Sequence, residues 1–292
     1  MSSSIEDIWF QSQDGLRLHA LAIGPRGGAA IPVICLPGIS RTAEDFRVLL
    51  EAFASEKRIV RRVIALDSRG RGLSDRDPNP ANYSVPIEVQ DLLTVIDAEK
   101  IGRAVFIGTS RGGILTMVLA AVRPKVIAGA VLNDIGPVLD MPGLLRIQSY
   151  VGKLPIPSNW DEAVAIMKGV TGKQFPGFTE EQWLGYVKRT WRQGKNGFEP
   201  QSDPAISRAL MDIDPAKIPP ALWLQFDALA ASAPVLVLRG EHSDLLSRST
   251  VDEMKIHGQS ISSIEIAGQG HAPSLDSRTI LQSILTFTSN CK

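Results

Sequence analysis

Cysteine is scarce in this chain of 292 residues, and no charge of one sign is in excess. The two cysteines are Cys35, in an apolar run, and Cys291, next to the C-terminal residue. This usage argues against a disulfide scaffold and predicts two free thiols in a reducing compartment. Lysine and arginine together number 31, as do aspartate and glutamate. With no long run of one sign to attract a polyanion, we expect no nucleic-acid partner.

Long apolar segments are missing as well. Nowhere do about 18 uncharged apolar residues follow one another, which is roughly the length that a membrane helix needs. Residues 1–15 show neither the basic start nor the apolar segment of a secretory signal peptide. We therefore expect a cytoplasmic protein that has no membrane partner and acts on a small-molecule substrate.

The sequence has enough apolar residues, 44% of the total, for one α/β domain that carries an insertion. Short β-branched or apolar runs, each closing on Gly, Pro, Asp or Ser, recur at 31–37, 62–67, 104–110, 126–134, 234–240 and 262–268. Between them, segments 43–57, 86–100 and 249–258 carry apolar residues at helical spacing. Residues 8–24 form two extended runs around Asp14-Gly15, which is typical of an antiparallel edge hairpin. The pattern predicts an α/β fold with a mostly parallel, doubly wound sheet and an N-terminal antiparallel hairpin.

One region, 138–232, departs from this alternation and is predicted to be a helical cap inserted into a core formed by 1–137 and 233–292. Helical patterns at 158–170, 179–194 and 204–213 follow one another without a strand between them. The region holds Trp160, Trp183 and Trp191, three of the five tryptophans. A tryptophan at helical spacing is usually a core residue. Three of them in one insertion nevertheless suggest an apolar roof that contacts substrate, with Phe175 and Phe178 beside them.

The stretch "VFIGTSRGGILTM", 105–117, places Ser110 between glycines at a turn from a strand to a helix. Glycine on both sides allows a strained turn that lifts the serine oxygen out of the sheet. The structural alternative is a serine that only caps the helix, but this would not explain the glycines. The context favours Ser110 as a nucleophile.

A serine nucleophile needs a histidine base, and the chain has four histidines. His271 follows the last predicted strand, comes after two glycines and precedes the final helix, so it is the candidate. His242 is a weaker alternative, while His19 and His257 are expected to be structural or solvated. The imidazole in turn needs a carboxylate to hold its tautomer. Asp244, after strand 234–240, is favoured; Asp134, at the end of strand 126–134, is the alternative, and Glu241 is an outsider.

Together these motifs resemble the α/β-hydrolase fold superfamily. "LPGISRTAEDF" is similar to its oxyanion strand and loop, and "ALDSRGRGLSD" to the turn after its fourth strand. "GTSRGG" is similar to its nucleophile elbow, "RGEHSD" to its acid loop and "GQGHAP" to its histidine loop. The order Ser, Asp, His also matches. The chain departs from many relatives in having Pro37-Gly38 in place of His-Gly, and Arg111 in place of Met or Gln after the nucleophile.

The resemblance implies a serine hydrolase that acts on a small carboxylic ester or related acyl substrate, with no metal or organic cofactor. It also implies that the backbone amides of Ile39 and Arg111 form the oxyanion hole. We expect a nearby carboxylate to hold the Arg111 side chain. A carbon–carbon bond hydrolase, a lactonase or a perhydrolase could use the same triad. A non-catalytic binding member of the fold is less favoured, because all three residue types of the triad are present. A nucleotide-binding protein is less favoured because the sequence has no phosphate-binding motif.

Overall fold

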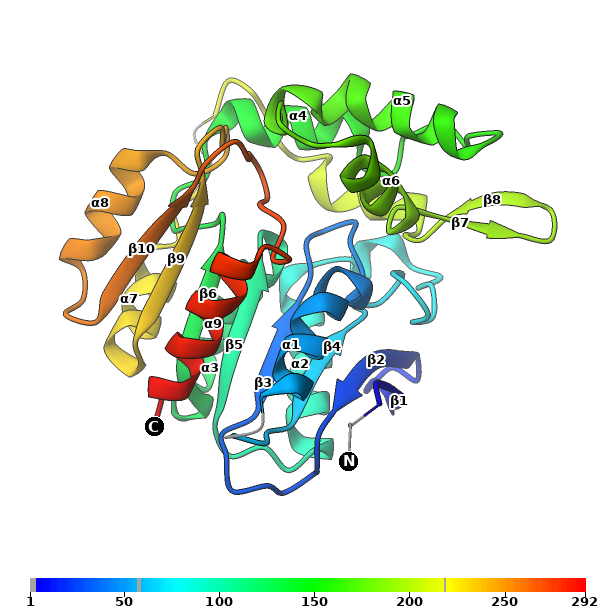
Figure 1. Cartoon of the computed structure of the whole chain (residues 1–292). Coiled ribbons are helices and arrows are strands. Elements are labelled where there is room, and N and C mark those ends of the chain that lie inside the picture. The colour runs from blue at the N-terminus through cyan, green and yellow to red at the C-terminus, as the bar shows by residue number, and fades with distance from the viewer. Residues whose placement is uncertain (1–3, 57–58, 218) are drawn as a thin grey trace.

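The computed structural model describes residues 4–56, 59–217 and 219–292, and within them eight strands form one mixed sheet in the order β1-β2-β4-β3-β5-β6-β9-β10 (Figure 1). The strands are Glu6–Gln11 (β1), Arg17–Ile23 (β2), Val33–Leu36 (β3), Val63–Leu66 (β4), Ala104–Thr109 (β5), Ile127–Asn133 (β6), Val235–Gly240 (β9) and Ile261–Ile266 (β10). β1 pairs with β2, and β2 with β4, in antiparallel fashion; the other pairs are parallel. The predicted sheet, including its edge hairpin, is confirmed.

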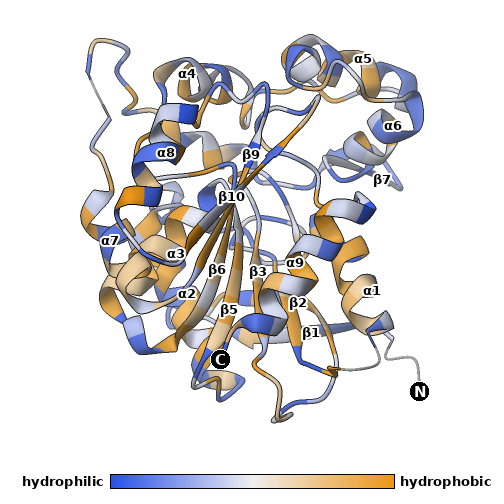
Figure 2. Ribbon diagram, turned by 60° about the vertical axis from the view of Figure 1, so that its left-hand side comes forward, coloured by the Kyte–Doolittle hydropathy of each residue, from blue (hydrophilic) through white to orange (hydrophobic). Residues whose placement is uncertain are grey.

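Helices cover both faces of the sheet. One face carries α1 (Arg47–Ser55) and α9 (Arg278–Asn290); the other carries α2 (Val85–Ala98), α3 (Arg111–Val122), α7 (Trp223–Ser232) and α8 (Arg248–Ile256). Successive side chains of a strand point to opposite faces, so a strand covered on both sides is apolar throughout. In β3, Ile34 and Leu36 join the core under α3, whereas Val33 and Cys35 join the core under α1. Figure 2 shows hydrophobic residues concentrated in these central strands.

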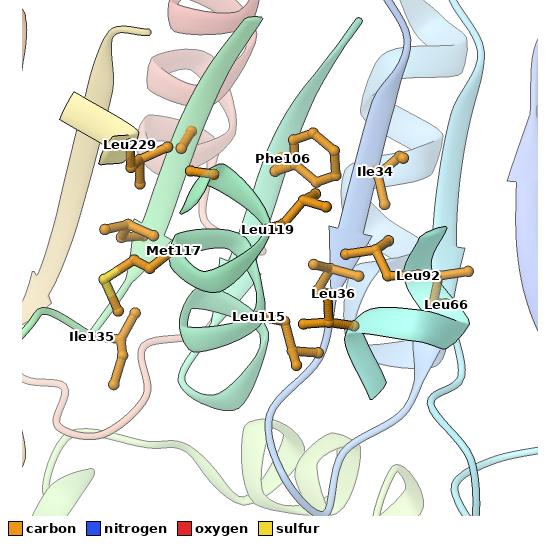
Figure 3. Packing of buried hydrophobic residues seen from close by; sticks show 14 of the residues in the cluster. Ile34, Leu36, Leu66, Leu92, Phe106, Leu115, Met117, Leu119, Ile135 and Leu229 are labelled. Carbon is orange, nitrogen blue, oxygen red and sulfur yellow. The ribbon is translucent and has the colours of Figure 1, made fainter. Parts of the chain in front are cut away.

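Helix α3 lies at the centre of its layer and is buried around most of its circumference. Its residues Leu115, Met117 and Leu119 lie among side chains of the strands, of α2 and of α7 (Figure 3). A helix that is apolar on all sides is stable only when neighbours cover it, and here α2 and α7 do so. Because α3 is held in this way, its N-terminus at Arg111 has a fixed position at the carboxyl end of β5.

The part of the chain between β6 and α7 forms a cap over the carboxyl ends of the strands (Figure 1). It contains α4 (Met141–Tyr150), α5 (Trp160–Thr171), the 3-10 helix Gly172–Gln174, α6 (Glu180–Lys188), β7 (Trp191–Gly194), β8 (Gly197–Pro200) and the 3-10 helix Pro204–Leu210. The expectation of a cap without strands is wrong, because β7 and β8 form an antiparallel hairpin there.

The cap predicted at 138–232 also extends too far at its C-terminal end. Residue 218 of that range lies outside the described residues, as do residues 1–3, 57 and 58 of the predicted core. Helix α7 packs on α3, and its residues Phe226 and Leu229 belong to the core under the sheet. Its place is therefore in the sheet layers and not in the cap.

Two further expectations can be compared with the structure. Cys35 and Cys291 are both free thiols, as predicted. Of the helices in the described part of the chain, none is both long and apolar enough to cross a bilayer.

Candidate active site

Ser110 lies at the sharp turn between β5 and α3, with a backbone φ of 51°. Such a value is strained for a residue other than glycine, and strain of this kind is concentrated at functional sites. The turn also requires glycine nearby, because a Cβ on Gly108 would lie 2.5 Å from the backbone of Gly112. A Cβ on Gly112 would lie 2.1 Å from the carbonyl oxygen of Leu36. The Ser110 hydroxyl makes no capping hydrogen bond to α3, so the cap alternative is wrong.

His271 faces this serine from the loop after β10. Its Nε2 lies 2.8 Å from Oγ of Ser110. The histidine is buried, and its backbone amide donates to Oε1 of Gln174 at 2.8 Å. Gln174 belongs to the cap, so the cap itself helps to position the histidine loop.

The carboxylate on His271 is Asp134 and not Asp244. Oδ2 of Asp134 lies 2.8 Å from Nδ1 of the histidine, and it also accepts a hydrogen bond from the Ser243 hydroxyl at 2.6 Å. Asp244 instead forms a two-pronged ion pair with Arg146 of α4, at 2.6 and 2.7 Å. The expectation that favoured Asp244 is therefore wrong, and the alternative, Asp134, takes its place. The physical reason is that the loop after β9 directs Asp244 toward the cap.

The two predicted oxyanion amides belong to segments that adjoin Ser110. Arg111 is the first residue of α3, where a helix leaves its amide without an intrahelical acceptor. The loop that carries Ile39 contacts the serine, since a Cβ on Gly38 would lie 3.8 Å from Cβ of Ser110. Neither amide donates a hydrogen bond to another of the described residues. Both are thus free to donate to a ligand.

The Arg111 side chain is held by a carboxylate, as predicted, and that carboxylate is Glu88 of α2. Nε of Arg111 donates to Oε2 of Glu88 at 3.0 Å, and Arg71 donates to Oε1 at 2.9 Å. Burial favours the neutral acid, but the two guanidinium groups outweigh it and hold the pKa of Glu88 below its usual value. Glu88 is therefore an ionised, buried anchor.

The other histidines lie away from Ser110. His19 is buried between Asp67 and Asp7, and His257 pairs with Asp227 and stacks on Trp223. His242 is exposed, and its Nε2 lies 4.0 Å from Oε2 of Glu241. The same oxygen of Glu241 accepts a hydrogen bond from the amide of Gly268 at 2.8 Å. Within the described ranges, no three His, Cys, Asp or Glu side chains gather as a metal ion would need. The base candidate thus remains His271.

The tryptophans do not form the roof that the sequence suggested. Trp183 and Trp191 are buried in a hydrophobic cluster inside the cap, and Trp160 packs against the same cluster. A small cavity of about 80 Å³ does lie between core and cap, and its lining includes Thr109 and Ala272, the chain neighbours of Ser110 and His271. Its walls include Arg41, Thr109, Asn133, Phe175, Phe178 and Tyr186, and none of the three tryptophans.

Comparison with known proteins agrees with this geometry. The model of the alpha/beta hydrolase family matches residues 33–281, which is most of the chain. This chain belongs to the alpha/beta hydrolase family. It is 34% identical over 266 residues to a 3-hydroxybutyrate-oligomer hydrolase of Cupriavidus necator, and the match covers 88% of each chain. A match to esterase YbfF of Escherichia coli is 36% identical but covers 37% of this chain and 39% of that one.

Among solved structures, an alpha/beta hydrolase from Novosphingobium aromaticivorans is 38% identical to the chain and superposes with a TM-score of 0.89. The match covers 98% of both chains. The relatives named as hydrolases and esterases, together with the family match, identify this protein as a hydrolase.

Two residues of this alpha/beta hydrolase site carried no signal that sequence reasoning could detect. Glu88 sits in an ordinary helical pattern, and Gln174 lies in a cap segment without a motif. Both act on groups that are distant in sequence: Glu88 on Arg111, and Gln174 on His271. An alignment of relatives would be the signal that could find such positions.

Proposed function

We propose that this hydrolase cleaves a carboxylic ester through an acyl-enzyme on Ser110, with His271 as general base and acid. The observation that carries the proposal is the continuous pair of 2.8 Å contacts, from Asp134 to His271 and from His271 to Ser110. A serine hydroxyl is a weak nucleophile until an adjacent base takes its proton. A buried carboxylate on the other ring nitrogen orients the imidazole and stabilises the imidazolium as it forms.

In the first half-reaction, Oγ of Ser110 attacks the ester carbonyl carbon while its proton passes to Nε2 of His271. The carbonyl oxygen becomes an oxyanion, which accepts hydrogen bonds from the amides of Ile39 and Arg111. As the carbon–oxygen bond to the alcohol breaks, His271 returns the proton to the leaving oxygen. The products of this step are the free alcohol and an ester of Ser110.

In the second half-reaction, a water molecule takes the position of the alcohol. His271 accepts a proton from the water as its oxygen attacks the acyl carbon, and the same oxyanion forms again. The intermediate collapses with transfer of the proton to Oγ, which restores Ser110 and releases the carboxylic acid. Asp134 accepts the hydrogen bond from Nδ1 of His271 throughout and takes no proton from it.

For the substrate class we infer an ester of a small hydroxy acid. Two observations support it. The C. necator relative is named as a hydrolase of 3-hydroxybutyrate oligomers, whose units are joined by ester bonds. The cavity next to Thr109 and Ala272 is small and combines aromatic walls, Phe175 and Phe178, with the polar groups of Arg41 and Asn133. Such a mixture suits a short acyl chain that carries a hydroxyl or carboxylate group.

We also propose that the enzyme works in a reducing compartment such as the cytoplasm. Its two thiols are free, which supports this placement. Burial raises the pKa of both Cys35 and Cys291, so neither is poised as a reactive thiolate.

The proposal is tested by treating the wild-type enzyme with a fluorophosphonate and measuring its intact mass. We expect one adduct, located at Ser110 by peptide mapping, and no adduct on Ser110→Ala. Turnover of 3-hydroxybutyrate dimers and trimers and of p-nitrophenyl butyrate should fall by roughly 10⁶-fold in Ser110→Ala.

Equal labelling of the alanine variant would overturn the assignment of the nucleophile. A panel of esters, lactones, peracid-forming mixtures and vinylogous diketones decides the reaction class. Preference for a lactone or a diketone over every ester would replace the ester proposal by one of the other reactions that share the triad.

A further inference from the structure

A buried bridge of side chains lies behind the nucleophile, formed by Arg71, Glu88 and Arg111. Arg71 comes from the glycine-bearing loop after β4, Glu88 from α2 and Arg111 from the start of α3. Glu88 joins the two arginines, with Oε1 accepting from Nη1 of Arg71 at 2.9 Å and Oε2 accepting from Nε of Arg111 at 3.0 Å. The mechanism above uses none of these three side chains.

The bridge ends on both residues of the proposed oxyanion hole. Nε of Arg71 donates to the carbonyl oxygen of Ile39 at 2.7 Å. The amide of Ile39 is one oxyanion donor and the amide of Arg111 is the other. These donors lie in separate elements, the loop after β3 and the first turn of α3, and the bridge connects the two through side chains.

The bridge is well placed to be rigid. The side chains of Arg71 and Glu88 are each only 1% exposed. Arg71 also donates to the carbonyl of Arg69 at 2.7 Å, and its guanidinium lies 5.6 Å from the ring centre of Tyr83. A group held by several partners in a closed environment moves little, which a preorganised site requires.

We propose that the Arg71–Glu88–Arg111 bridge sets the spacing and direction of the two oxyanion amides, so that Glu88 and Arg71 are positioning residues for ester hydrolysis. The proposal rests on the function proposed above. Oxyanion donors stabilise the transition state only when they lie about 2.7–3.1 Å from the oxyanion, so a shift of one loop weakens that stabilisation. Ground-state binding of the ester should depend much less on this spacing.

The test is Glu88→Gln, which keeps the shape of the side chain but removes its charge and one acceptor. We expect kcat to fall by roughly 10- to 100-fold, a part of what complete loss of one donor costs, while KM changes by less than about threefold. The inhibition constant of phenylboronic acid should rise in parallel with the loss in kcat/KM. Its tetrahedral adduct with the serine places an oxygen in the oxyanion hole.

Glu99→Gln is the matched control. Glu99 is also 1% exposed and also paired with two arginines, Arg62 and Arg26. Its partner Arg62 adjoins the amino-terminal end of β4, away from the carboxyl ends that hold the site. This variant should lose a similar amount of thermal stability and keep kcat and boronate affinity near those of the wild type.

Arg71→Lys separates geometry from charge, because a lysine keeps the positive charge but cannot hold Ile39 and Glu88 together. Its kcat should fall as in Glu88→Gln. Should Glu88→Gln fail to fold, Arg111→Met decides instead: Arg111 is 12% exposed, and its substitution cuts the bridge at the edge. A fall in kcat without a matching change in KM supports the proposal in either variant.

The proposal is overturned if Glu88→Gln, or Arg111→Met in its place, matches Glu99→Gln in kcat and boronate affinity. It is also overturned if kcat and KM change together. These results leave the proposed function intact as long as wild-type Ser110 is labelled by the fluorophosphonate. Absence of that labelling would contradict the function itself.

Discussion

The backbone conformation and local hydrogen bonds of Asp134 explain why this residue, and not Asp244, contacts His271. Its backbone φ is 55°, which an aspartate adopts more readily than most residues because its short side chain bonds locally. Its amide donates to the carbonyl of Leu238 at 2.7 Å, and Oδ1 accepts from the amide of Gly240 at 2.7 Å. These bonds join the ends of β6 and β9 and direct the other carboxylate oxygen toward His271. Asp134 therefore anchors two strands and orients the imidazole at once.

We predict that Asp134→Asn lowers kcat by about 10⁴-fold, because an amide that donates to Nδ1 selects the wrong tautomer of His271. Steady-state hydrolysis of p-nitrophenyl butyrate measures the loss. Asp244→Asn is the comparison: it weakens the partly exposed ion pair with Arg146 and should cost far less activity. Equal losses in the two variants, or a larger loss in Asp244→Asn, would contradict the geometry of the site.

The cap has a small hydrophobic core of its own, separate from the two cores of the sheet. Trp183 of α6 and Trp191 of β7 lie at its centre, together with Phe175 from the turn after α5. Aromatic side chains buried in this way stabilise the arrangement of the helices that they join. The cap is tied to the core by polar contacts, including Arg41 to Thr190 and Tyr83 to Asp203. Selectivity should therefore depend on cap residues that line the cavity, such as Phe178, and not on Trp183 and Trp191, which lie inside the cap.

We predict that Trp191→Ala destabilises the protein by roughly 3–5 kcal/mol, because it leaves a large void in the cap. Relative activity on p-nitrophenyl acetate, butyrate and octanoate should stay as in the wild type. Phe178→Ala, at the wall of the cavity, should do the opposite: it should shift this preference toward longer chains and cost less stability. Thermal melting and the ester series measure both effects. A changed chain-length preference in Trp191→Ala with an unchanged one in Phe178→Ala would show that the assignments are reversed.

Besides the pairing of β2 with β4, one buried carboxylate joins the N-terminal hairpin to two loops of the fold. Oδ2 of Asp67 lies 2.7 Å from Nδ1 of His19, and the same carboxylate accepts from the amides of Ala43 and Leu73. Asp67 thus joins β2, the loop after β3 and the loop after β4. Because the loop after β3 also carries Ile39, this junction couples the edge of the sheet to the region of the site.

This junction makes stability depend on pH. Burial opposes the charged imidazole, but hydrogen bonds to Asp67 and Asp7 outweigh it and raise the pKa of His19 above its usual 6.5. A raised pKa in the folded state contributes stability that is complete below the unfolded value and is lost as pH rises through the folded value. We predict that the stability gap between wild type and His19→Gln is wider at about pH 5.5 than at about pH 8.5.

Urea unfolding of both proteins at the two pH values measures the gap. Asp7→Asn is the control, because Asp7 is the exposed partner of His19. Removing its charge should make the stability gap to His19→Gln differ less between the two pH values, without breaking the contact with Asp67. A gap of equal size at both pH values would mean that His19 is not charged in the folded protein at low pH.

The strands of the main sheet, the edge hairpin and the turn at Ser110 could all be predicted from the sequence, because their causes are local. Apolar runs that end on turn residues specify buried strands, and glycines around a serine specify the sharp turn. His271 could also be identified, since two glycines and the preceding strand place it at the same edge of the sheet as Ser110. For these residues, neighbours along the chain carry the information.

The partner of the histidine, the bridge through Glu88 and the burial of Trp183 and Trp191 depended on the folded structure. Asp134 and His271 are 137 positions apart, and whether they meet depends on the pairing of β6 with β9 and on one backbone angle. Likewise, α7 has a helical pattern that fits either the cap or the core, and only its packing on α3 places it in the core. Contacts of this range follow from how whole elements pack, which no short stretch of sequence encodes.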